Sequence, residues 1–156
     1  MISQANIKVD FITDDETIDL RSRVLRPGQP LTACRYAEDK LNSTFHLGIK
    51  DGATVICNGT FILNSCHFFP DELSAYRLRG MATDPNYRGL QLGSKLIQAA
   101  ENILQKRNCN LLWFNARESA FAFYEKNSFS SIGEIFDIPT IGPHKVMYKW
   151  LKDKNA

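Results

Sequence analysis

The chain has 156 residues, of which 44% are hydrophobic and 23% are charged. That length is typical of one domain, and the composition is that of a globular protein rather than a disordered one. The formal net charge of +2 is too small to predict binding to nucleic acid or to a membrane surface. We therefore expect a single domain over residues 1–156, with a small molecule or a peptide as its partner.

The four cysteines, Cys34, Cys57, Cys66 and Cys109, include no closely spaced pair, so they predict neither a zinc site nor a thioredoxin-type motif. No secretory signal is visible at the N-terminus, and no apolar stretch is long enough to span a bilayer. We expect no bound metal, reduced thiols and a cytoplasmic location. The sequence does not reveal the oligomeric state, and a homodimer is one option.

The N-terminal part of the chain predicts a strand followed by a helix. Apolar residues alternate with polar ones over residues 5–12, which is typical of a half-buried strand with Phe11 on its apolar side. Thr13 and the acidic residues after it are typical of a helix start, and helically spaced apolar residues then continue until Arg26-Pro27. Residues 31–43 fit either a short helix or a loop.

The rest of the chain mixes strands and helices. Residues 45–63 predict a hairpin around the turn dipeptide Asp51-Gly52. A strand over residues 76–83, a long amphipathic helix, a buried strand over 111–114, a short helix and two final β segments follow. This order predicts an α/β layered domain with a mixed, mostly antiparallel sheet and helices on both faces. One central strand–helix–strand unit should be locally parallel.

The turn between the strand ending at Asp84-Pro85 and the long helix is suited to bind phosphate. A helix start presents N–H groups without intrahelical partners, together with the positive end of the helix dipole. Gly89 and Gly93 let a phosphate approach these amides, and Arg88 adds a positive charge. The glycines alone also fit a plain strand-to-helix turn. The sequence patterns of the nucleoside triphosphate and dinucleotide loops are absent from this turn.

The segment Arg88-Gly89-Leu90-Gln91-Leu92-Gly93-Ser94 resembles the acyl-CoA signature [QR]-x-x-G-x-[GA] of the GNAT superfamily of N-acyltransferases. Gln91 replaces the middle glycine, which raises the question of a positive φ at that position. Residues 120–129 resemble the later family motif A-x-x-F-Y-x-K-x-G-F, with Ser128 in place of its glycine. We expect this serine to strain or reshape the end of the short helix.

The resemblance implies a GNAT-like fold and transfer of an acetyl group from acetyl-CoA to the amine of a small molecule or peptide by direct attack. It implies that the pantetheine arm pairs with the strand Met81-Ala82-Thr83 and that the loop binds the pyrophosphate. The loop residues are Arg88, Gly89, Leu90, Gln91, Leu92, Gly93 and Ser94. Tyr124 would be the acid that protonates the leaving thiolate, although its ring also fits simple packing of the short helix. Asn115 either bonds the pantetheine arm or caps the following helix.

The proton acceptor for the attacking amine is left unassigned, with Glu72, His46 and His144 as candidates. Cys57 and Cys66 are expected to be ordinary buried cysteines rather than nucleophiles.

Two other functions remain open from the sequence: a GNAT-like module that binds acyl-CoA as a sensor or scaffold without turnover, and a nucleotide-phosphate binding protein. The arginines at 21, 23 and 26 either draw an acidic acceptor or form a solvated helix face.

Overall fold

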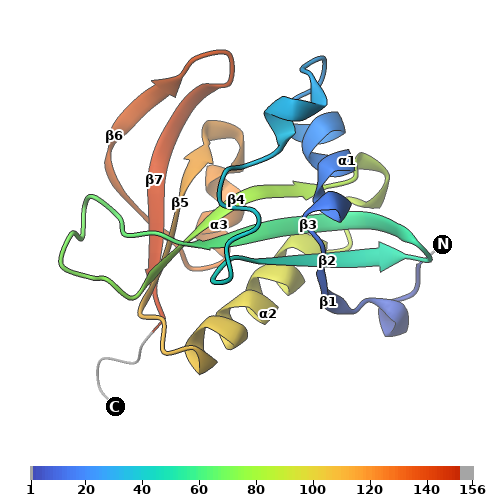
Figure 1. Ribbon diagram of the computed structural model, residues 1–156, viewed down its shortest axis with the longest axis horizontal. Helices are drawn as coiled ribbons and strands as arrows, with labels where there is room; N and C mark the ends of the chain where they lie inside the picture. The colour runs from blue at the N-terminus through green and yellow to red at the C-terminus, as the bar shows by residue number, and fades with distance from the viewer. Residues whose placement is uncertain (1, 152–156) are drawn as a thin grey trace. The chain divides into compact units, whose positions relative to one another are not determined.

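The structure is a computed structural model, in which residues 2–151 are described. Its strands are β1 (Val9–Ile12), β2 (Phe45–Asp51), β3 (Thr54–Leu63), β4 (Ala75–Thr83), β5 (Leu111–Arg117), β6 (Ser130–Ile138) and β7 (Gly142–Trp150) (Figure 1). Its helices are α1 (Ile18–Leu20), α2 (Leu92–Lys106) and α3 (Phe121–Lys126). The 3₁₀ segments are η1 (Gln4–Asn6), η2 (Asp15–Thr17), η4 (Leu31–Cys34), η5 (Pro85–Tyr87) and η6 (Glu118–Ala120), and η3 (Arg21–Leu25) is a π-helical segment.

The strands form one hydrogen-bonded sheet in the order β1-β2-β3-β4-β5-β7-β6. The β4–β5 pair is parallel, and the pairs β1–β2, β2–β3, β5–β7 and β6–β7 are antiparallel. This arrangement confirms the predicted mixed, mostly antiparallel sheet with one locally parallel strand–helix–strand unit.

Contacts divide the chain into two compact units. The first comprises the residues up to Ile62 together with Leu78–Asn102, and the second comprises Leu63–Arg77 and the residues from Ile103 onward. Strand β4 and helix α2 therefore contribute residues to both units. The single domain over 1–156 stays a prediction.

Helices cover both faces of the sheet in the first unit, as predicted. A Cβ on Gly59 of β3 would lie 3.3 Å from the side chain of Leu96 in α2. The next residue, Thr60, accepts a 2.7 Å hydrogen bond from Arg21 of η3. Because successive strand residues point to opposite faces, α2 and η3 lie on opposite sides of β3.

The first helix begins where the sequence predicts. The Thr13 N–H donates to the Glu16 carboxylate at 2.9 Å, and the Glu16 N–H donates to the Thr13 hydroxyl at 3.2 Å, which is a capping box. The strand before it differs from the prediction in its buried face: Phe11 is 63% exposed, whereas Ile12 is 9% exposed. Ile12 packs in a core cluster with Leu20, and this contact decides which side of β1 faces inward.

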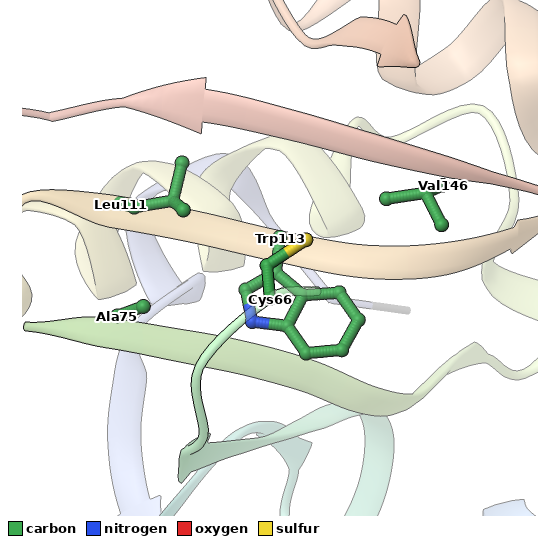
Figure 2. Packing of buried hydrophobic residues seen from close by; sticks show 5 residues of the cluster. All are labelled: Cys66, Ala75, Leu111, Trp113 and Val146. Carbon is green, nitrogen blue, oxygen red and sulfur yellow. The ribbon is translucent and has the colours of Figure 1, made fainter. Parts of the chain in front are cut away.

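The second unit has a core of aromatic and small side chains between β4, β5 and β7 (Figure 2). Trp113 is its largest member, and its indole N–H donates to the Asn64 carbonyl at 2.8 Å. The cluster consists of Cys66, Ala75, Leu111, Trp113 and Val146. The buried strand predicted over 111–114 is confirmed and extends further, to Arg117. No helix in residues 2–151 has the length and apolar character needed to cross a membrane.

Arg21 is fully buried, which neither interpretation of the three arginines anticipated. Its guanidinium binds both Asp39 carboxylate oxygens at 2.8 and 2.9 Å, and it also donates to the Cys34 carbonyl at 2.9 Å. Arg23, in contrast, binds Asp19 and Asp84. A buried guanidinium requires such compensation because its transfer out of water is costly. The first two of the three arginines therefore hold the fold together.

The variant Asp39→Asn keeps the shape of the buried partner but removes its charge. We expect its free energy of unfolding to fall by about 3–5 kcal/mol, because a buried cation would be left without a counter-charge. The control Asp19→Asn removes a carboxylate partner of Arg23 that is 62% exposed, and it should cost less than about 1 kcal/mol. Urea unfolding followed by circular dichroism measures both values, and equal losses would contradict the prediction.

The Arg21–Asp39 pair makes the free energy of unfolding depend on pH. Burial by itself raises the pKa of Asp39, but the hydrogen bonds from Arg21 and from the Tyr36 N–H outweigh burial and hold the pKa below its usual value of 3.8. A lowered folded-state pKa gives stability that is present above the unfolded-state pKa and is lost as the pH falls through the folded-state value. The stability difference between parent and Asp39→Asn should therefore be constant above about pH 5 and shrink below about pH 4.

Candidate active site

Helix α2 begins with backbone donors that have no helical partner. The Lys95 N–H donates to the Gln91 carbonyl at 3.1 Å, which is the first intrahelical bond. Within residues 2–151, no backbone acceptor is found for the N–H groups of Leu92, Gly93 and Ser94. These donors lie at the positive end of a 15-residue helix, which is the arrangement that favours an anion.

The loop before α2 keeps the backbone shape of a glycine-containing loop although one glycine is missing. Gly89 has a φ of 84° and Gln91 a φ of 59°, so both lie in the left-handed region. A Cβ on Gly89 would have no atom within 4 Å, and Arg88, Gly89 and Gln91 are all exposed. The replacement of glycine by Gln91 has therefore changed the side chain but not the backbone conformation that the position requires.

Three hydrogen bonds fix the start of this loop. Asp84 accepts a 2.9 Å hydrogen bond from the Asn86 N–H and a 3.0 Å bond from Arg23. These two partners lower the pKa of Asp84, the Asn86 N–H most of all, against the opposite effect of burial. The Tyr87 hydroxyl donates to Asp51, the last residue of β2, at 2.6 Å. Arg23 thus positions the turn that leads into the loop.

The predicted pantetheine strand, Met81-Ala82-Thr83, forms the end of β4. Ala82 is buried in the core, whereas Met81 and Thr83 are half-buried on the other face. The Thr83 hydroxyl donates to the Cys57 Sγ at 3.4 Å. Burial raises the pKa of the Cys57 thiol to about 11, so this cysteine is not a ready nucleophile.

Asn115 lies within β5, two residues before its end, and not after the strand as the sequence analysis placed it. The residue that caps the following segment, η6, is Arg117. The alternative role of Asn115 as a helix cap is therefore wrong. Its side chain is half-buried, and no side-chain hydrogen bond to it is found in the described part of the chain.

Tyr124 lies on α3 and is buried, 7% exposed. Its ring centroid is 4.2 Å from that of Phe114 and 6.0 Å from that of Phe129. The Tyr124 ring therefore packs the short helix against β5, which is the structural role that the sequence also allowed. Phe114 and Asn115 are neighbours in β5, so Tyr124 packs on the face of this strand opposite to the Asn115 side chain.

Helix α3 ends in a Schellman motif that has serine at the position where glycine is usual. The Phe129 N–H donates to the Tyr124 carbonyl at 3.0 Å, and the Ser128 N–H donates to the Glu125 carbonyl at 3.0 Å. Ser128 has a φ of 72°, in the left-handed region that is unfavourable for a residue with a Cβ, so strain at this helix end stays the prediction. The motif ties the Tyr124 backbone to the start of the next strand.

The three candidate bases all have structural partners. His46 is buried between the Thr60 hydroxyl and the Asp39 carbonyl, at 2.7 and 3.0 Å. Glu72 accepts a 2.7 Å bond from Asn110. The His144 Nδ1 is 2.8 Å from the Gly142 carbonyl, and its ring lies against Phe136. The base stays unassigned, and residues 2–151 contain no group of three or more His, Cys, Asp or Glu side chains placed to hold a metal ion.

The comparisons with known proteins agree with this geometry. A family model described as "Acetyltransferase (GNAT) family" matches residues 15–129, which include both motifs. The chain belongs to the GNAT acetyltransferase family. The Bacillus subtilis (strain 168) protein named "Uncharacterized N-acetyltransferase YitI" is 42% identical over 146 residues, covering 94% of this chain and 97% of that protein.

Solved structures of GNAT proteins have the same fold. An aminoglycoside 6'-N-acetyltransferase in complex with coenzyme A has a TM-score of 0.76 at 13% identity, over 94% of this chain and 98% of that chain. The Escherichia coli ribosomal-protein-S18-alanine N-acetyltransferase has a TM-score of 0.73 at 16% identity, over 96% and 98%. The resemblance inferred from the two motifs is confirmed: this protein is a GNAT N-acetyltransferase, an enzyme that uses acyl-CoA and an amine.

This GNAT enzyme also contains a charged cluster that the sequence analysis missed, formed by Tyr36, Glu38 and Arg79 beside Gly80. The Arg79 guanidinium lies 3.9 Å from the centre of the Tyr36 ring and 3.6 Å from Glu38. The sequence signal was an arginine in a predicted strand, directly before a glycine. Its partners are about forty residues away in the chain, so the spacing alone did not reveal them.

Ser128→Gly tests the cost of a left-handed residue at the end of α3. We expect the free energy of unfolding to rise by about 0.5–1 kcal/mol, because glycine adopts this φ without steric penalty. Ser130→Gly is the matched control, since Ser130 is also exposed but extended within β6, where glycine should destabilise by a similar amount. Thermal and urea unfolding compare the two; a loss of stability in both variants would show that Ser128 is unstrained.

Proposed function

We propose that this GNAT enzyme transfers an acetyl group from acetyl-CoA to an amine by direct attack, and that the loop before α2 holds the cofactor's pyrophosphate. The observation that carries this proposal is the set of three N–H groups at the start of α2 without backbone acceptors, beside an exposed loop in the left-handed conformation. The N-acetyltransferase name of the 42% identical relative supports acetyl as the transferred group.

The residues at the start of α2 are suited to bind the doubly charged pyrophosphate of the cofactor. In the proposal, the amides of Leu92, Gly93 and Ser94 donate to the phosphate oxygens, and the absence of a Cβ at Gly93 permits close approach. Arg88 is exposed and supplies a positive charge beside these donors. Gly89, Leu90 and Gln91 shape the loop between Arg88 and the helix.

The end of β4 is proposed to bind the pantetheine arm. The parallel ladder between β4 and β5 ends at the pair Arg77–Trp113, and β4 continues for six further residues to Thr83. Residues Met81, Ala82 and Thr83 lie outside this ladder, so their backbone groups on that edge are proposed to pair with the amides of the arm. One free N–H here would stabilise the negative charge that develops on the acyl oxygen during attack.

We assign Tyr124 as the acid that protonates the leaving thiolate. A phenol has a reference pKa of about 10 and a thiol about 8.5, so a positioned tyrosine can protonate the thiolate. The Schellman motif fixes the Tyr124 backbone, and the Phe114 and Phe129 rings hold its side chain. Asn115 is proposed to bind the pantetheine arm through its side-chain amide. Acetyl-CoA supplies the thioester from which the acetyl group leaves.

The fold does not select the acceptor amine. The two solved relatives act, by their names, on an aminoglycoside and on an alanine of a ribosomal protein. A small molecule and a peptide are thus both compatible with the proposal, and the acceptor has to be inferred from the side chains of this chain.

Tyr124→Phe tests the assigned acid. We expect kcat to fall about 100-fold or more while the KM for acetyl-CoA changes by less than about threefold, because the ring packing is kept and only the proton donor is lost. The control Tyr148→Phe removes the hydroxyl of a half-buried tyrosine outside the proposed site and should leave kcat unchanged. Thiol release from acetyl-CoA measures both, and parental activity in Tyr124→Phe would remove this residue from the mechanism.

Gly93→Glu tests the pyrophosphate site. We expect binding of coenzyme A to be lost in calorimetry, because the side chain blocks and repels the phosphates at the helix start. Gln98→Glu adds the same charge to an exposed position further along α2 and should bind within about threefold of the parent. Circular dichroism checks folding of both variants. Arg88→Gln probes the same site at an exposed position. If both Arg88→Gln and Gly93→Glu bind coenzyme A with the parental affinity, the pyrophosphate does not lie at the start of α2.

A further inference from the structure

Tyr36 is held between two arginines in the first unit. Its ring centre lies 3.8 Å from the guanidinium carbon of Arg21 on one face and 3.9 Å from that of Arg79 on the other. Arg21 is fully buried and bound to Asp39, and Asp39 also accepts a 3.0 Å hydrogen bond from the Tyr36 N–H. The orientation of Tyr36 is therefore fixed from both its backbone and its buried face.

Gly80 allows this stack to approach β4. Its φ is 65°, and a Cβ at this position would lie 3.0 Å from Arg21 Nε and 3.1 Å from the Tyr36 hydroxyl oxygen. The Gly80 carbonyl accepts a 3.0 Å hydrogen bond from the buried side chain of Asn58. The Tyr36 hydroxyl is thus held directly beside the β4 backbone, one residue before Met81.

The outer arginine of the stack has donors that the protein does not use. The Arg79 side chain is 27% exposed, and its nearest acidic partner, Glu38, is 3.6 Å away, beyond hydrogen-bond distance. Within residues 2–151, no hydrogen bond is found for the Arg79 guanidinium or for the Tyr36 hydroxyl. Arg21 and Arg23, by comparison, each bind carboxylates at 3.0 Å or less.

We propose that Arg79 and the Tyr36 hydroxyl bind an anionic oxygen group, a carboxylate or phosphate, on the acceptor amine. The inference rests on the proposed function, in which the pantetheine arm pairs with Met81–Thr83 and a free N–H there faces the acyl oxygen. Arg79 is two residues before Met81, and a fully extended strand advances about 3.3 Å per residue, so the two positions are at most about 7 Å apart. The acceptor is therefore a short molecule that carries its anionic group a few bonds from the amine.

The chemistry of the pair suits this ligand. A guanidinium presents a planar fork of N–H donors that matches two carboxylate or phosphate oxygens, and stacking on an aromatic ring keeps that fork oriented. Because Arg21 and Asp39 hold Tyr36 in place, the fork of Arg79 is oriented before the acceptor arrives, which reduces the entropy lost on binding. Glu38 lies beside Arg79 and disfavours acceptors that carry a second negative charge there.

A panel of matched amines tests the inference. Thiol release from acetyl-CoA is measured with short amino carboxylates, their carboxamides and aminophosphonates of the same length, together with neutral amines. We expect kcat/KM for the anionic amines to exceed that for the carboxamides at least about tenfold, as a charge-assisted hydrogen bond predicts. The carboxylate and phosphonate arms show which anionic group is preferred.

Variants then assign the preference to the cluster. Arg79→Gln should bring the kcat/KM for an amino carboxylate to within about twofold of that for its carboxamide. Tyr36→Phe should lower the ratio of these two kcat/KM values in part. Both variants should keep the parental KM for acetyl-CoA. Arg35→Gln removes another exposed arginine, one that binds Asp15, and should leave the ratio unchanged.

The inference is overturned if no anionic amine reacts, if the parent does not distinguish carboxylates from carboxamides, or if Arg35→Gln lowers the ratio as much as Arg79→Gln. Binding of coenzyme A to the parent, measured separately by calorimetry, distinguishes this failure from failure of the proposed function. If coenzyme A binds but the enzyme does not prefer anionic amines, only the acceptor assignment fails. If coenzyme A does not bind, the acceptor assignment and the proposed function both fail.

Discussion

The buried ion pair between Arg21 and Asp39 constrains several segments of the first unit at once. A guanidinium removed from water is tolerated only when nearly all of its donors have acceptors, and here these come from a loop carbonyl, a carboxylate and a strand hydroxyl. The positions of η3, residues 34–39 and β3 are therefore set together. A shift of any one of them would leave a charge unpaired in the core, so this part of the molecule is defined by polar complementarity as much as by apolar packing.

Two positions show that a backbone conformation can persist after the residue that best suits it has been lost. Gln91 and Ser128 replace the glycines of the family motifs, and both adopt positive φ. Such a conformation costs about 1–2 kcal/mol in a residue with a Cβ, so surrounding hydrogen bonds must enforce it. At Ser128 these bonds are the two of the Schellman motif, and at Gln91 the carbonyl accepts the first bond of α2.

The sequence predicts those parts of the structure that depend on local patterns. The capping box at Thr13, the hairpin around Gly52 and the amphipathic α2 all rest on residues within a few positions of each other. The buried face of β1 was predicted wrongly because it depends on contact with Leu20 and more distant residues. The burial of Arg21 was missed for the same reason, since its partners Asp39 and Thr60 are 18 and 39 positions away.

The candidate site also has one part that depends on local sequence and one part that depends on long-range contacts. Its proposed phosphate-binding part uses backbone donors, so the motif that predicts it is short, local and recognisable even with a substituted glycine. The Arg79 cluster uses side chains from β4 and from residues 36–38, and it depends on Arg21 and Gly80 to bring them together. No continuous motif can encode such a group. A site for the cofactor can therefore be proposed from sequence, whereas a site for the acceptor can be proposed only when the long-range packing of this particular chain is known.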